Sequence, residues 1–176
     1  NKFTHYYHDD YDSKSLSIDM ILAIHLERSG TIWISSFTGL NKINRKERPF
    51  TQYNNFESSW DNSFGSSAII ANSDNTSLWI EAGNEILRFD PPSGTFVSQF
   101  SLQSVGVTYI AGDNSGNIWM KHFSGGLSLK EMNGKETRIQ YSSGKEFNQQ
   151  VYCLYSPPSS DTVWVGTLEG DLLSIS

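Results

Sequence analysis

Tryptophan residues recur along this chain at nearly even intervals of 46, 40 and 45 residues. Each lies between two apolar neighbours, and the four are Trp33, Trp79, Trp119 and Trp164. An apolar-Trp-apolar triplet is typical of a short β-strand, since aromatic and β-branched residues favour extended backbone. A repeat of about 40–50 residues built from such strands predicts the blades of a β-propeller, each of which is a small antiparallel sheet.

Short apolar runs and Gly-containing turns divide the first repeat into four strand-length segments. Gly30 separates the first two segments and can take the positive φ that a tight turn requires. Gly116 precedes Trp119 by the same three residues, which predicts a shared turn geometry. We therefore expect an all-β chain of about four four-stranded antiparallel blades, forming a single β-propeller segment over residues 1–176. The approximate blade bounds are 18–53, 66–100, 105–141 and 149–176.

The last repeat offers only three strands, whereas the N-terminus carries an additional one. The run Phe3-Thr4-His5-Tyr6 matches Phe50-Thr51-Gln52-Tyr53 at three of four positions, so residues 3–6 predict an extra outer strand. Two arrangements fit this pattern. Either the strand completes the last blade and closes a four-bladed ring, or the chain is a fragment of a larger propeller, which is the interpretation we favour.

The repeat motif resembles that of a known family. The run Gly30-Thr31-Ile32-Trp33-Ile34 leads to Gly39-Leu40, and Asp113-Asn114-Ser115-Gly116-Asn117-Ile118-Trp119 is similar. This pattern resembles the two-component regulator propeller repeat, and the likeness covers almost the whole chain. The second unit departs from it, because Gly is missing before Trp79 and Gly-Leu is missing after it.

The resemblance implies a location and a function. In that family, such repeats build large propellers in the periplasmic sensor region of Bacteroides-type hybrid two-component histidine kinases, which typically respond to complex-carbohydrate fragments. It therefore implies a non-enzymatic periplasmic segment, the extracytoplasmic part of an inner-membrane sensor. The role of this segment would be to sense a ligand, with an oligosaccharide as the expected ligand, and to take part in signal transduction. The histidine kinase would lie elsewhere in the parent protein.

Charge and hydropathy argue against two classes of partner. The net charge is −6, and nucleic-acid binding draws its affinity from Lys and Arg, so no nucleic acid is expected. No run approaches the ~18 apolar residues of a membrane span, so no membrane contact is expected in this segment. Cys153 lies in the apolar run 151–155 and is expected to be a small buried side chain.

No metal, cofactor or catalytic site is predicted. His5, His8, Asp9 and Asp10 are potential metal ligands. However, His5 and His8 are three residues apart in extended chain and point to opposite faces, which favours a polar linker. The sequence contains no Gly-x-Ser-x-Gly elbow and no phosphate-binding Gly loop.

The best candidates for ligand binding lie in the linker after the first blade and after the Trp strands. Phe56, Trp60 and Phe64 recur every four residues in the one candidate helix, 55–65, and Trp60 breaks the tryptophan period. Aromatic rings stack on sugar faces, although this spacing also fits a linker packed on its blade. The turns after two Trp strands add polar side chains. The full set is Phe56, Trp60, Asn62, Phe64, Glu81, Lys121 and His122.

Two other functions remain open at this stage. Some lyases are built on propellers with similar repeats and use a His and a metal, and His122 is the best candidate base for such an enzyme. A third interpretation is a structural interaction segment without a small ligand. Its exposed end faces would pair with other propeller blades or with a second copy of the chain.

Overall fold

The structure, a computed structural model, describes residues 2–44, 50–53, 68–72, 76–82, 85–102, 106–157 and 160–176. Within these ranges every regular element is a β-strand, which confirms the all-β prediction. None of the described residues belongs to a helix long and apolar enough to cross a membrane. The candidate helix over residues 55–65 lies outside the described residues.

The strands form four antiparallel sheets, each with its strands in chain order. The first contains β1 (Ile21–Leu26), β2 (Thr31–Ser36), β3 (Gly39–Asn44) and β4 (Phe50–Tyr53). The second contains β5 (Ile69–Ala71), β6 (Leu78–Ala82), β7 (Glu85–Asp90) and β8 (Thr95–Ser101). The third contains β9 (Val107–Gly112), β10 (Ile118–His122), β11 (Leu127–Lys130) and β12 (Glu136–Arg138). The fourth contains β13 (Val151–Tyr155), β14 (Val163–Thr167) and β15 (Leu172–Ile175).

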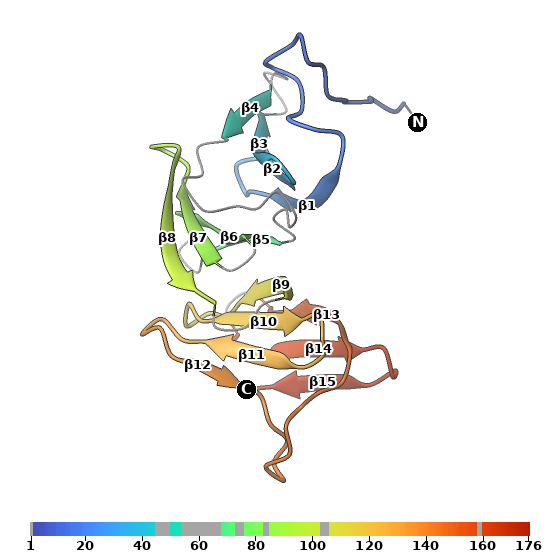
Figure 1. The fold of residues 1–176 in the computed structure, drawn as a ribbon, viewed down its shortest axis with the longest axis vertical. Coiled ribbons are helices and arrows are strands. Elements are labelled where there is room, and N and C mark those ends of the chain that lie inside the picture. Colours follow the sequence, from blue (N-terminus) through green and yellow to red (C-terminus); the bar gives the residue numbers. More distant parts are fainter. Residues whose placement is uncertain are drawn as a thin grey trace.

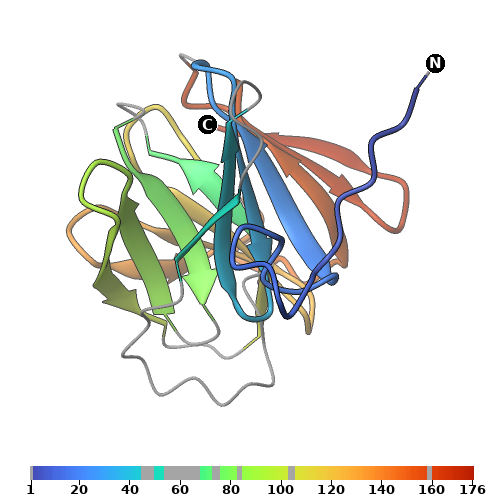
Figure 2. The same ribbon diagram turned by 90° about the horizontal axis from the view of Figure 1, so that it is seen from above.

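These sheets have the blade arrangement of a β-propeller, as the tryptophan period predicts. They follow one another along an arc, with the first strand of each sheet toward its inner side (Figures 1 and 2). Strand β5 packs next to both β1 and β9, and β13 packs next to β9. We refer to the four sheets as blades 1 to 4.

The turn before each Trp strand explains why the repeat folds in this way. Gly30 and Gly116 have φ values of 88° and 83°, which confirms their shared positive-φ geometry. In both turns the Gly N–H donates to the carbonyl oxygen three residues earlier, Glu27 O at 2.9 Å and Asp113 O at 3.1 Å. The following strand therefore starts in the same register in both blades.

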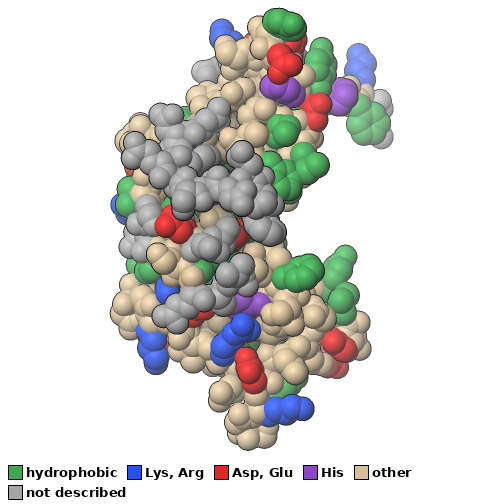
Figure 3. All heavy atoms as spheres, viewed as in Figure 1, with side chains coloured by type: hydrophobic (Ala, Val, Ile, Leu, Met, Phe, Trp, Pro, Cys, Tyr) green, Lys and Arg blue, Asp and Glu red, His purple; other side chains and the backbone are tan. Residues whose placement is uncertain are grey.

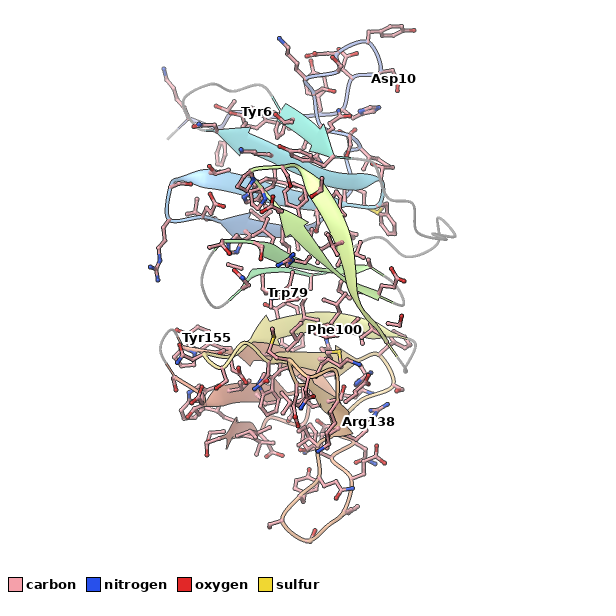
Figure 4. All side chains as sticks on the ribbon, turned by 90° about the vertical axis from the view of Figure 1, so that its left-hand side faces the viewer. Tyr6, Asp10, Trp79, Phe100, Arg138 and Tyr155 are labelled. Carbon is pink, nitrogen blue, oxygen red and sulfur yellow. The ribbon has the colours of Figure 1, made fainter. Side chains whose placement is uncertain are left out.

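The hydrophobic core lies between blades, and each buried Trp is covered by the next blade. Trp33 clusters with Leu78 and Ile80 of blade 2. Trp79 clusters in the same way with blade 3, and Trp119 with blade 4. The aromatic contacts continue outward, since the rings of Trp79 and Phe100 stack 5.8 Å apart at 22° (Figure 4). Burial of large rings between sheets is the main stabilising contribution of such a stack.

The N-terminal segment does not complete the last blade, so the closed-ring alternative is wrong for residues 3–6. These residues belong to no strand, and blade 4 contains β13, β14 and β15 alone. The segment instead packs on blade 1 at the opposite end of the arc, where Phe50 N–H donates to Lys14 O at 2.9 Å (Figure 1). Leu16 is buried there with Ile43 and Phe50. The similarity of residues 3–6 to residues 50–53 reflects a shared preference for extended backbone. A β-strand also needs a neighbouring strand to pair with, and residues 3–6 have none in the structure.

Blade 4 also departs from the expected burial. Trp33, Trp79 and Trp119 are 0%, 5% and 5% exposed, whereas Trp164 is 40% exposed. Cys153, on the same sheet, is exposed rather than buried as expected. Both differences have one cause, because no other sheet among the described residues covers the face of blade 4 that carries Trp164 and Cys153 (Figure 1).

Candidate functional site

A cleft of about 550 Å³ lies along the inner side of the arc. Its wall is formed by β1, β5, β9 and β13, the first strands of all four blades, together with the turns that follow them. Figure 3 shows the molecule hollowed on this side. We call this feature the inner cleft, and it is the concave site of the described residues to which all four blades contribute.

Two tyrosine side chains and an arginine give the inner cleft its chemistry. Tyr109 of β9 is 41% exposed and Tyr155 of β13 is 60% exposed, so both rings offer accessible faces. Arg28 follows β1 and lies in the same wall. Tyrosine rings combine an apolar face with a hydroxyl, which suits ligands that have both apolar and hydroxyl surfaces.

His25 of β1 is the titratable histidine of the inner cleft. Burial lowers the pKa of His25, and the nearby negative charge of Glu27 opposes this effect. The imidazole is therefore neutral at neutral pH and carries one N–H donor and one acceptor nitrogen. Such a ring can hydrogen-bond a hydroxyl group in either direction.

Asp113 also lines the inner cleft, but both oxygens of its carboxylate accept hydrogen bonds from other residues of blade 3. Its Oδ1 accepts from the backbone N–H of Asn117 at 2.9 Å. Its Oδ2 accepts from Asn117 Nδ2 and from the indole Nε1 of Trp119, both at 3.0 Å. The cleft therefore presents aromatic, amide, imidazole and guanidinium groups around a carboxylate whose hydrogen bonds stabilise blade 3.

This set of groups can stack on an apolar face and can donate and accept hydrogen bonds. Among the described residues, no group of three His, Cys, Asp or Glu side chains could hold a metal ion. A second cavity of about 450 Å³ lies at the outer rim beside β4. It is bounded by the outermost strands of blades 1 and 2, whereas the inner cleft is lined by all four blades and gathers exposed rings and charged groups from three of them. We therefore take the inner cleft as the candidate site.

The candidates from the linker cannot be placed. Phe56, Trp60, Asn62 and Phe64 all lie outside the described residues, so their predicted role in ligand binding stays a prediction. The structure does describe Glu81, Lys121 and His122.

Glu81, Lys121 and His122 lie inside strands β6 and β10, not in the turns after them as expected. Glu81 and His122 are 2% and 1% exposed, and Lys121 is half-buried. Each strand extends two residues beyond its Trp-centred triplet, because pairing with β7 continues through Ala82 and pairing with β9 continues through His122. Lys121 pairs across the sheet with Tyr109, so it is the predicted residue that lies beside the inner cleft.

His122 belongs to a buried polar contact within blade 3. Its Nε2 lies 2.7 Å from Ser128 Oγ, and both side chains are buried. Burial lowers the pKa of His122, the positive charge of Arg138 lowers it further, and Glu136 opposes the shift. A histidine in this position stabilises the packing of β10 on β11 and does not open onto the inner cleft.

Sequence reasoning missed the four residues that define the inner cleft, namely His25, Arg28, Tyr109 and Tyr155. These residues lie in or beside apolar runs, each of which predicts a buried first strand of a blade. One signal was available, since polar or aromatic residues interrupt those runs at positions that alternate with the buried ones.

Solved structures share this fold. The extracellular domain of BT4673, a candidate one component or hybrid two component system of B. thetaiotaomicron, is similar with a TM-score of 0.72 and 13% identity over 90% of this chain and 22% of that chain. The extracellular domain of BT3049, a candidate hybrid two component system of the same organism, has a TM-score of 0.73 and 20% identity over 97% and 24%. A catalytically inactive virginiamycin B lyase from Staphylococcus aureus, with Quinupristin, has a TM-score of 0.64 and 13% identity over 99% and 59%.

At these identities the likeness shows a shared propeller fold. The sequence matches no family model and no curated protein sequence. The chain spans less than a quarter of the length of the BT4673 and BT3049 domains.

Proposed function

We propose that this chain is a non-enzymatic segment of an extracytoplasmic sensor propeller, located in the periplasm, that binds an oligosaccharide in the inner cleft. The observation that carries the proposal is the inner cleft itself. Exposed Tyr109 and Tyr155 line it together with His25 and Arg28, and the four residues come from three different blades. Stacking rings combined with side chains that donate and accept hydrogen bonds are features that recognise a sugar.

The fold supports the sensor part of the proposal. BT4673 and BT3049 are described as extracellular domains of one component or hybrid two component systems, and both share this blade arrangement. In the proposed parent protein, a histidine kinase lies outside this segment and receives the signal. Because the inner cleft touches the first strand of every blade, a bound ligand would favour one inter-blade packing over another.

Lyase activity is the alternative that the similarity to virginiamycin B lyase raises. His122, the base that sequence reasoning assigned to such an enzyme, is buried against Ser128 and does not line the inner cleft. Binding without turnover therefore fits this site better. A stoichiometric divalent ion in the purified protein, together with ligand breakdown, would support the lyase instead.

Titration calorimetry with a panel of short neutral oligosaccharides tests the proposal. Tyr109→Ala and Tyr155→Ala should each weaken binding about tenfold, since each removes one stacking ring. Tyr11→Ala, which removes a 99% exposed ring far from the cleft, is the matched control and should bind as the wild type does. Trp60→Ala tests the linker site separately, and unchanged affinity would remove Trp60 from the site. Equal affinities for the wild type and both cleft variants would refute the inner cleft as the site.

A further inference from the structure

The turns after the first strands of blades 1 and 3 each place a polar side chain at the inner cleft. These turns comprise residues 27–30 and 113–116, and each begins with an acidic residue and ends with Gly. Arg28 and Asn114 hold the same position in the two turns, directly after the acidic residue, and both line the inner cleft. This position of the repeat therefore faces the cleft in two different blades.

The backbone of both turns is held by equivalent hydrogen bonds. Glu27 N–H donates to Thr31 O at 2.9 Å, and Asp113 N–H donates to Asn117 O at 3.1 Å. The N–H of the Gly that ends each turn donates back to the carbonyl oxygen of the same acidic residue. The fold of each blade thus fixes the backbone from which the cleft-facing side chain projects, which lowers the ordering cost of binding a ligand there.

The carboxylates of the two turns already accept hydrogen bonds from their own blades. Glu27 Oε2 accepts from Ser29 Oγ at 2.7 Å, and its Oε1 accepts from Trp33 Nε1 at 3.3 Å. Both oxygens of Asp113 accept from residues of blade 3. None of the ion pairs formed by the described residues includes Arg28. The guanidinium of Arg28 therefore keeps its donors for another group.

Arg28 is the cationic side chain of the cleft wall among the described residues. The chain has a net charge of −6, so its overall composition does not predict a cation in this place. The exposure of this turn position does not depend on the place of a blade in the sequence. Asn114 is also exposed, although strand β9 of its blade packs next to both β5 and β13.

We propose that Arg28 makes the inner cleft selective for acidic oligosaccharides, its guanidinium binding the carboxylate of a uronic acid unit. This inference rests on the proposed function, because it takes the inner cleft as the sugar site. The guanidinium offers parallel N–H donors that match the two oxygens of a carboxylate. Tyr109 and Tyr155 can stack on neutral and acidic sugar rings alike, so the preference between the two comes from Arg28.

Titration calorimetry with matched pairs of hexose oligosaccharides tests the inference. Each pair contains a neutral oligosaccharide and the same oligosaccharide with its primary hydroxymethyl groups oxidised to carboxylates. We expect the wild type to bind the acidic member about tenfold more tightly at low salt, because a hydrogen bond to a charged group contributes at least this factor. Arg28→Gln should abolish the preference and leave the affinity for the neutral member unchanged.

Two further variants separate local recognition from other effects of charge. Arg88 is exposed on β7 and does not line the inner cleft, so Arg88→Gln changes the net charge equally and should keep the full preference. Arg28→Lys retains the charge without the planar guanidinium and should keep part of the preference. Circular dichroism shows whether the variants fold, which is expected because both substituted side chains are exposed.

Three outcomes would overturn the inference and leave the inner cleft as a site for neutral sugars. The first is equal affinity of the wild type for both members of every pair, and the second is a preference that persists in Arg28→Gln. The third is loss of the preference in Arg88→Gln, because net charge would then explain it. Tighter binding of a sulfated counterpart than of the uronate would overturn the assignment to a carboxylate. Absence of binding by every oligosaccharide would instead refute the proposed function, and this inference with it.

Discussion

The indole Nε1 of Trp119 donates a hydrogen bond of 3.0 Å to Oδ2 of Asp113, six residues earlier, and both side chains are buried. Glu27 accepts from Trp33 Nε1 over the same six-residue separation at 3.3 Å. An acidic residue at the start of the turn thus anchors the Trp of the following strand. This contact links the turn before the Trp strand to the inter-blade core, and its loss should be measurable.

Asp113→Ala should destabilise the chain by about 2 to 3 kcal/mol. The substitution leaves the buried indole N–H of Trp119 and the N–H of Asn117 without their acceptor, and an unsatisfied buried donor costs about 1 to 3 kcal/mol. Urea unfolding gives the free energies. Asp161→Ala, which removes an exposed carboxylate bonded only to the exposed Ser115 in the contacts described, should change stability by no more than about 0.5 kcal/mol. Equal losses for the two variants would contradict the anchoring role.

Gly125→Ala should be more destabilising than Gly134→Ala, although both glycines have a positive φ, of 91° and 88°. The left-handed backbone costs any L-residue about 1 to 2 kcal/mol at both positions. A Cβ at Gly125 would also lie 2.7 Å from the carbonyl oxygen of Asn148, whereas a Cβ at Gly134 meets no atom within 4 Å. The clash should add about 1 to 3 kcal/mol, measured as the difference between the two unfolding free energies. If the two variants are equally stable, the chain around Asn148 does not pack against this turn.

His8 should hold the N-terminal segment more firmly at lower pH. Its Nδ1 lies 2.6 Å from Leu16 O and its Nε2 lies 2.8 Å from Asp10 Oδ1, so both contacts are hydrogen bonds only when both nitrogens carry protons. The hydrogen bond to Leu16 O, and then the one to Asp10, raise the pKa of His8. The resulting stabilisation is fully present below the unfolded pKa of about 6.5 and is lost as pH rises through the raised folded value.

Amide hydrogen exchange of residues 8–17 across this pH range measures the effect. Exchange should accelerate as pH rises, beyond the intrinsic pH dependence of exchange, and His8→Gln should remove this extra acceleration. Asp10→Asn should reduce it in part, because the Leu16 contact remains. An identical pH dependence in the wild type and His8→Gln would contradict the role of His8.

His122 should have the opposite pH dependence. Burial, and then the charge of Arg138, lower its pKa in the folded chain. As pH falls below the unfolded value of about 6.5, the unfolded state binds a proton that the folded state resists, so stability decreases. Urea midpoints at about pH 8 and about pH 5 measure this loss. His122→Gln, which retains a partner for Ser128, should lose less stability on acidification than the wild type, and an unchanged loss would assign the effect to other groups.

The sequence predicted the strands and sheets that recur in every blade. It did not predict the features that depend on contact with an adjacent blade or strand. The period of Trp33, Trp79 and Trp119 reports a strand that is buried in the same way in each blade, so the sheets and their order were predictable. Trp164 has the same local sequence, yet it is exposed, because its burial requires a blade beyond residue 176 or a partner. The prediction of an outer strand over residues 3–6 was wrong for a related reason, because a preference for extended backbone does not ensure that a neighbouring strand is there to pair with.

The inner cleft was not predictable for a different reason. Tyr109 and Tyr155 lie in apolar first strands, and only the arrangement of four blades around one side exposes their rings to a common space. Lys121 was selected from a supposed turn and lies in a strand beside Tyr109. Errors of a few residues at strand ends change which face of a sheet a side chain occupies, so site residues are harder to predict than the blades that carry them.

Nuclear magnetic resonance of the histidine rings tests the proposed oligosaccharide site most directly. The chain has four histidines, of which His25 lines the inner cleft, His122 is buried within blade 3, and His5 and His8 lie in the N-terminal segment. On titration with the short neutral oligosaccharides, we expect saturable shifts of the His25 ring resonances and unchanged resonances of the other three histidines. Saturable shifts confined to the other histidines, or no shift of His25 with any member of the panel, would contradict it.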